Sequence, residues 1–83
     1  MYDVSVDEYT QQQLDSLPRD ARSAWNELRE TLALVPGNGM PLNPAVTGGV
    51  LTWQFGPHKE GLAYYLVLER DQKVVVLEIL WLI

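Results

Sequence analysis

The only histidine of the chain lies in a short polar segment, Gly56-Pro57-His58-Lys59-Glu60-Gly61, between two apolar runs. His58, Lys59 and Glu60 could together move a proton or stabilise a negative charge, as general acid–base catalysis requires. A charged turn between two apolar strands is most often a solvated connection, however. We therefore interpret the segment as a turn and keep His58 and Lys59 as candidate catalytic residues.

Other kinds of site lack the residues they need. There are no cysteines, which excludes disulfides, thiolate metal sites and cysteine nucleophiles. No carboxylate stands at a metal-ligand spacing from His58. The glycines of Gly37-Asn38-Gly39 and Gly48-Gly49 lack the preceding strand and following helix of a phosphate-binding loop. We expect neither a cofactor nor a metal.

The charge balance argues against direct binding of nucleic acid. The 83 residues include 11 acidic and 6 basic ones, a formal net charge of −5, whereas binding to phosphates draws on clustered lysines and arginines. The N-terminus carries acids where a signal peptide needs basic residues. No apolar run approaches the roughly 20 residues of a membrane span. We expect a cytoplasmic protein with no membrane contact.

The first half of the chain predicts a strand followed by two helices. Residues 1–6 alternate between apolar and polar side chains, as a half-buried strand does. Asp7 is suited to cap a helix that runs to about Ser16, and Pro18 fits the first turn of the next helix. In that second helix an apolar stripe follows the 3.6-residue period: Ala21, Ala24, Trp25, Leu28, Leu32 and Val35.

The second half predicts a long loop and three strands. Glycine, proline and asparagine are dense between Pro36 and Gly49. Residues 50–55, 62–69 and 73–82 read as strands joined by polar turns. We predict one α+β domain over residues 1–83, with the order β-α-α-β-β-β and two helices on one face of a four-stranded, mainly antiparallel sheet. The predicted core places Trp25, Leu28 and Leu32 against Leu51, Trp53, Phe55, Leu66, Leu77 and Ile79.

Both faces of the last two strands are apolar, and two helices can cover only one of them. We assign the following residues to the uncovered face: Ala63, Tyr65, Val67, Val74, Val76, Leu80 and Leu82. An apolar surface of that size usually marks an interface. We therefore predict a partner-binding surface there, formed by Tyr65, Val67, Val74, Val76, Leu80 and Leu82. A sheet that curls enough to shelter these side chains is the alternative.

This layout resembles the RelE/ParE superfamily of type II toxins. The resemblance covers nearly the whole chain and rests on the element order, Leu17-Pro18 between the helices, the Pro- and Gly-rich loop, a strand ending in Gly56, the pair Tyr64-Tyr65 and a valine-rich last strand. It implies an antitoxin as partner. A second copy of the chain is the other partner that the uncovered face could bind.

The ribonuclease branch of that superfamily usually carries arginines at positions that match Thr52, Gln54 and Leu62 here. His58, Lys59 and either Tyr64 or Tyr65 would supply only part of the set that RNA cleavage needs. The resemblance thus implies a toxin-like protein that acts through protein contacts or has a degenerate activity. A ribosome-dependent mRNA endoribonuclease with a relaxed active site, and a non-toxic interaction domain that kept the fold, are the alternatives.

Overall fold

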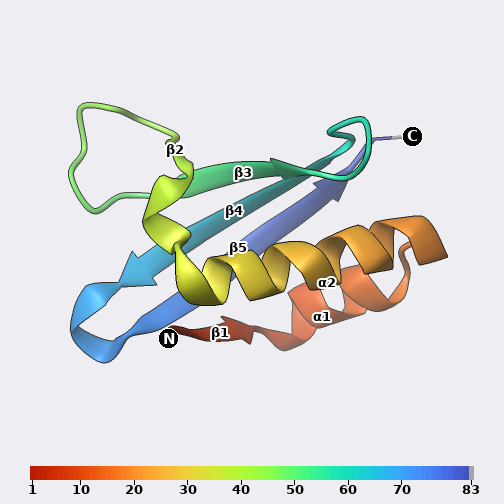
Figure 1. Ribbon diagram of the computed structural model, residues 1–83, viewed down its shortest axis with the longest axis horizontal. Helices are drawn as coiled ribbons and strands as arrows, with labels where there is room; N and C mark the ends of the chain where they lie inside the picture. Colours follow the sequence, from red (N-terminus) through yellow and green to blue (C-terminus); the bar gives the residue numbers. More distant parts are fainter. Residues whose placement is uncertain (83) are drawn as a thin grey trace.

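A computed structural model describes residues 1–82 (Figure 1). Its elements are β1 (Asp3–Val6), α1 (Glu8–Asp15), α2 (Arg19–Leu34), a 3-10 turn at Pro36–Asn38, β2 (Met40–Pro41), β3 (Leu51–Phe55), β4 (Gly61–Leu68), a 3-10 turn at Glu69–Asp71 and β5 (Lys73–Trp81). They follow the predicted order, with three short additions: two 3-10 turns and the strand β2. The α+β class and the order of helices and main strands are confirmed.

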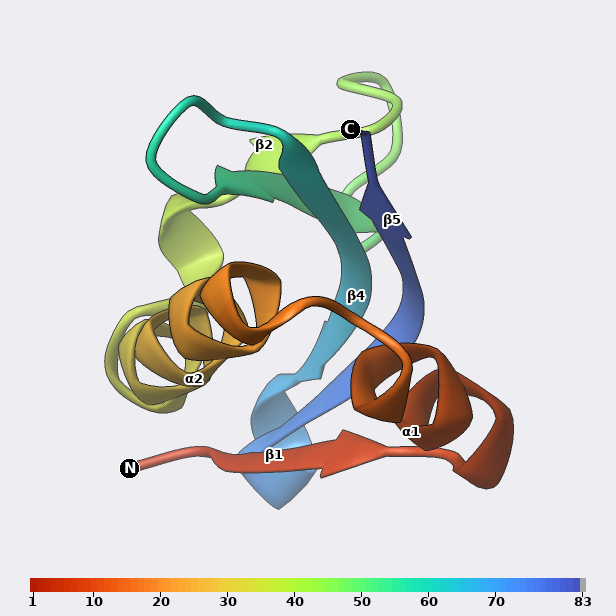
Figure 2. The ribbon, with the colours of Figure 1, turned by 90° about the vertical axis from the view of Figure 1, so that its right-hand side faces the viewer.

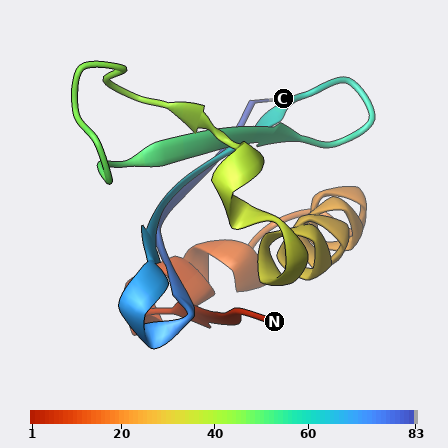
Figure 3. The ribbon, with the colours of Figure 1, turned by 60° about the vertical axis from the view of Figure 1, so that its left-hand side comes forward.

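The sheet has five strands in the order β1-β5-β4-β3-β2, one more than predicted. β1 pairs in parallel with β5, and the remaining neighbours are antiparallel. The additional strand, β2, has two residues and lies within the segment that we predicted to be a loop. Met40 and Pro41 pair with the start of β3, and the following stretch projects from the body of the molecule (Figure 3).

Local chemistry explains where the helices begin. The carboxylate of Asp7 accepts a hydrogen bond from the backbone N–H of Thr10 at 2.7 Å, which caps α1 as predicted. The same bond is the main cause that lowers the pKa of Asp7. Pro18 precedes the first turn of α2 instead of lying within it. The predicted apolar stripe of α2 is confirmed for Ala21, Trp25, Leu28 and Leu32, which are buried, and Ala24 packs against the core. The prediction is wrong for Val35, which follows the last residue of the helix and is 44% exposed.

The core lies between α2 and the concave side of the curved sheet (Figure 2). The Trp25 ring meets Phe55 of β3 edge-on at a centroid distance of 6.3 Å. α1 lies beside β5 beyond the end of β1, where its Leu14 joins the same core. α1 therefore covers the part of the β5 edge that the short strand β1 leaves unpaired.

A β-bulge in β5 decides which side chains face the core. Tyr64 is opposite Glu78 and Tyr65 is opposite Val76, so Leu77 has no partner in β4. One additional residue reverses the alternation of side chains along the strand. Val76 before the bulge and Ile79 after it are consequently both buried on the α2 side. The buried hydroxyl of Thr10 donates to the Leu77 carbonyl at 3.4 Å.

The predicted assignment of the two sheet faces is wrong for most residues. Five residues that we assigned to the uncovered face belong to the core or pack against it: Ala63, Tyr65, Val67, Val74 and Val76. Conversely, Leu66 is in register with Val75 on the opposite face, and Leu77 is exposed. The cause is that both faces of β4 and β5 are apolar and that strict alternation cannot describe a strand with a bulge.

Candidate functional site

The side of the sheet that faces away from α2 presents a surface of paired side chains. Residues directly opposite each other on neighbouring strands point to the same face. One row joins Gln54, Leu62 and Leu80, and the next joins Thr52, Tyr64 and Glu78. We call the following residues the outer patch: Thr52, Gln54, Leu62, Tyr64, Leu66, Val75, Glu78 and Leu80. Most of them are half-buried, and Leu80 is 41% exposed.

The three positions that the resemblance assigns to arginines in nucleases lie together on this patch. Gln54 is opposite Leu62, and Thr52 follows two residues away on the same face. These three side chains line a hollow of about 480 Å³ at the start of β4, together with Asn38, Gly39, Met40, Trp53 and Lys59. Lys59 is the one cationic residue of that lining. The structure thus brings these three side chains together in a hollow whose lining holds a single cation.

His58 and Lys59 lie in the exposed turn between β3 and β4, as the sequence predicts. The Glu60 carboxylate accepts the backbone N–H of His58 at 2.8 Å, and backbone hydrogen bonds from Glu60 itself and from His58 lower the pKa of Glu60. Lys59 has a left-handed φ of +59°, and Gly56 a φ of +99°. The turn is therefore held by its own backbone and carboxylate, and His58 is not among the residues that line the hollow.

The two candidate tyrosines point to opposite faces. Tyr64 lies on the outer patch between Thr52 and Glu78. Tyr65 is fully buried, and its hydroxyl donates to the carbonyl of Pro36 at 2.6 Å. Burial raises the pKa of Tyr65 to about 12. Tyr65 therefore anchors the 3-10 turn at Pro36–Asn38 and has no hydroxyl proton available at the surface.

The raised pKa of Tyr65 makes an alkaline loss of stability the expected result. The unfolded chain releases this proton near pH 10, whereas the folded protein retains it, so the stabilisation is present below about pH 10 and is lost as the pH rises toward about 12. We expect the urea midpoint to fall less steeply over this range in Tyr65→Phe. The exposed residue Tyr9 provides the control Tyr9→Phe, and equal slopes for the wild type and Tyr65→Phe would contradict the burial of this hydroxyl.

Four residues of the predicted partner-binding set cannot lie on the open face of this fold. Tyr65, Val74 and Val76 are in the core and Val67 packs against it. Leu80 and Leu82 remain exposed, at 41% and 71%. The uncovered face therefore carries residues that differ from the predicted partner-binding set. Leu80 belongs both to that set and to the outer patch.

A polar cluster at the edge of the outer patch was not found by sequence reasoning. The Gln13 amide of α1 donates to the Glu78 carboxylate at 2.8 Å and to the Tyr9 hydroxyl at 3.4 Å. The amide oxygen of Gln13 is buried without a hydrogen-bond partner. We call Tyr9, Gln13, Tyr64 and Glu78 the Glu78 cluster. The available signal was the charged Glu78 within an otherwise apolar strand.

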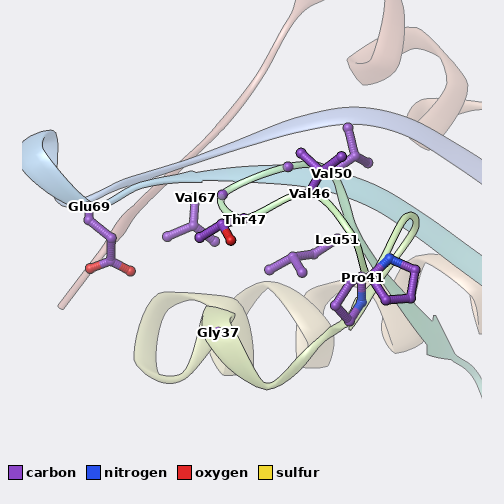
Figure 4. Close-up of a pocket in the computed structure, with 11 residues that line it drawn as sticks. Gly37, Pro41, Val46, Thr47, Val50, Leu51, Val67 and Glu69 are labelled. Carbon is purple, nitrogen blue, oxygen red and sulfur yellow. The ribbon is translucent and has the colours of Figure 1, made fainter.

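A second hollow, of about 350 Å³, lies against the loop that precedes β3 (Figure 4). Its lining is largely apolar and includes Val46, Leu51 and Val67, with the carboxylate of Glu69 at one end. That carboxylate accepts the Tyr2 hydroxyl at 2.8 Å, which raises the pKa of Tyr2. Because its one ionisable lining residue already has a partner, this hollow offers no catalytic set.

Two further features are absent from residues 1–82. No group of three or more histidine, aspartate or glutamate residues in this part of the chain is arranged to hold a metal ion. Neither of its two helices could span a lipid bilayer.

The sheet order and the two helices that pack against it give an α+β fold similar to that of RelE toxins. A chain of the RelBE2 toxin–antitoxin complex of Mycobacterium tuberculosis superposes with a TM-score of 0.79 at 22% identity, covering 96% of both chains. A chain of the archaeal RelE–RelB complex of Pyrococcus horikoshii gives a TM-score of 0.74 at 21% identity, covering 96% of this chain and 93% of that one.

The isolated RelE toxin of E. coli is also similar in structure. It gives a TM-score of 0.67 at 16% identity and covers 100% of this chain and 86% of the toxin. No protein-family model and no curated protein matches the sequence. The likeness is therefore one of fold, with few residues in common.

Proposed function

We propose that this chain is the toxin-like member of a type II toxin–antitoxin pair and that it acts by binding another protein and not by cutting RNA. The fold supports the first part, since similar structures include toxin–antitoxin complexes from a bacterium and an archaeon. The outer patch supports the second part, because it offers half-buried apolar side chains beside the position where a nuclease would need cations.

The observation that carries the proposal is the chemistry of Thr52, Gln54 and Leu62. They are neighbours on one surface, as residues of one active site would be. Cleavage of RNA builds negative charge on the phosphorane, which positioned cations stabilise. A hydroxyl, an amide and an isobutyl group supply no such charge, and the net charge of −5 disfavours the approach of RNA.

The alternative of a relaxed ribonuclease would depend on few groups. Lys59 borders the hollow and could contact a phosphate. Tyr64 faces the same side of the sheet and could donate a proton, whereas the hydroxyl of Tyr65 is bonded to Pro36. The relaxed nuclease therefore predicts that activity is lost when Lys59 or Tyr64 is replaced.

Induced expression in a bacterial host tests the proposal. We expect growth to slow without codon-linked cleavage of transcripts, measured by mapping transcript ends. The product of the neighbouring reading frame should restore growth and co-purify in a fixed ratio. Normal growth would instead favour the non-toxic interaction domain.

A matched set of variants separates binding from cleavage. Lys59→Ala and Tyr64→Phe should leave the transcript pattern as it is in the wild type. Thr52→Arg, Gln54→Arg and Leu62→Arg, combined in one chain, restore the cations and should increase RNA binding in a filter assay at low salt. Codon-linked cleavage by the wild type that disappears with Lys59→Ala would overturn the proposal.

A further inference from the structure

The Glu78 cluster contains unused capacity to accept hydrogen bonds. Glu78 is the one charged member of the outer patch, and it lies opposite Tyr64 in the register of β4 and β5. One carboxylate oxygen accepts the Gln13 amide, and the amide oxygen of Gln13 is buried without a donor. An unsatisfied buried acceptor is unfavourable, so the Gln13 amide gains when it can turn its oxygen toward a donor that is bound at the neighbouring Glu78 carboxylate.

The chemistry of that donor follows from the groups that surround it. A carboxylate, an amide oxygen and a tyrosine ring are the partners that a guanidinium or ammonium group prefers. A cation that bonds the Glu78 carboxylate also leaves the Gln13 amide free to turn its oxygen toward the same donor. The residues on either side, Leu62, Leu66 and Leu80, require apolar contacts.

Charge selects among the possible occupants of the patch. A second copy related by a two-fold axis would bring two Glu78 carboxylates into one interface, and burying like charges together is unfavourable. A nucleic acid would place phosphates against the same carboxylate. A cationic segment is instead attracted by Glu78 and by the net charge of −5 of the whole chain.

We infer that the outer patch binds an apolar peptide segment of a partner protein that places one arginine or lysine against Glu78. This inference rests on one part of the proposed function, namely that the outer patch is the binding surface. It adds the chemistry of the segment that binds there. Apolar contacts with Leu62 and Leu80 supply area, and the cation at Glu78 fixes the register of the segment.

A display selection of random 12-residue peptides against the folded full chain tests this inference without any toxin assay. Binders of the wild type should be rich in leucine or valine with one arginine or lysine. Binders of Glu78→Lys should carry aspartate or glutamate instead. Glu30→Gln, which removes an exposed charge from α2 on the far side of the core, should select the same peptides as the wild type.

Affinities of one selected peptide complete the test. Replacement of its arginine by citrulline, an uncharged group of similar shape, should weaken binding roughly tenfold. Glu78→Gln should weaken the arginine peptide by a similar factor and the citrulline peptide hardly at all, as a double-mutant cycle requires. Thermal unfolding checks that each variant is folded, and an amide at position 78 can still accept the Gln13 bond.

Three outcomes would overturn the inference. The first is a selection that yields no binder. The second is a set of binders whose affinity is unaffected by Leu62→Lys. The third is that the wild type and Glu78→Lys select peptides of the same charge. Failure of the proposed function gives a result that differs from failure of this inference. Growth on induction is then normal, while the selected peptides still show the charge preference.

Discussion

Replacing Trp25 with alanine is expected to remove a large share of the protein's free energy of unfolding. The side chain is 4% exposed and packs edge-on against Phe55 between α2 and the sheet. Truncating a buried tryptophan costs about 3–5 kcal/mol. A domain of this size has a free energy of unfolding of only about 5–15 kcal/mol. Urea titration followed by circular dichroism measures the loss directly.

Leu34→Ala is the matched control for that experiment. Leu34 lies at the end of the same helix but is 65% exposed, so its truncation should change the free energy of unfolding by less than about 0.5 kcal/mol. A Trp25→Ala protein that unfolds cooperatively with nearly the midpoint of the Leu34→Ala protein would contradict the packing of α2 on the sheet.

Gly39→Ala is expected to destabilise the protein by about 1–3 kcal/mol, the usual range for overpacking. A Cβ atom at position 39 would lie 2.0 Å from the hydroxyl oxygen of Tyr65 and 3.0 Å from the carbonyl oxygen of Thr52. The φ of Gly39 is −68°, which any residue adopts, so the cost comes from the clash alone. Either the buried Tyr65 or the turn at Pro36–Asn38 must move.

Tyr65→Phe should partly rescue Gly39→Ala, because it removes the atom nearest to the new methyl group. Tyr65→Phe alone loses the hydrogen bond to Pro36 and should cost about 1–2 kcal/mol. The double variant should therefore be clearly more stable than the sum of the two changes predicts. Strictly additive costs, measured by urea denaturation, would show that the two residues do not meet.

The helices and the order of the main elements along the chain could be predicted because their signals are local. The spacing of Trp25, Leu28 and Leu32 allows only one helix face, and Asp7 caps the helix that it precedes. β2 was missed because it is defined by its pairing with β3. Nothing in the residue types of Met40 and Pro41 indicates that pairing.

The faces of β4 and β5 could not be assigned by alternation because the choice depends on tertiary packing. Two signals were nevertheless present. Gly61 and Ala63 are small because large residues of β3 pack beside them: the Phe55 ring would lie 2.6 Å from a Cβ on Gly61, and Trp53 is opposite Ala63. Glu78 would share a face with Val76 in a strand without a bulge, which favours a change of alternation between them.

The candidate site was predictable only in part, again because some of its contacts depend on tertiary packing. The positions of Thr52, Gln54 and Leu62 follow from the resemblance alone, and their gathering on one surface follows from the register of β3 and β4. The Glu78 cluster joins residues 65 positions apart, Gln13 and Glu78. Its formation depends on the bulge at Leu77 and also on α1 lying along the edge of β5, which has no sequence pattern of its own.

The parallel pairing of β1 with β5 has a consequence for how the protein is made. Within the described residues Asp3–Val6 pairs with one strand, at residues 73–76, so this segment cannot pair until β5 has been synthesised. Contacts of such long sequence separation form late, since the entropy of closing the loop must be lost before they contribute. The outer patch also needs β5. A nascent chain therefore cannot present the complete outer patch until β5 has been synthesised and has paired with β4.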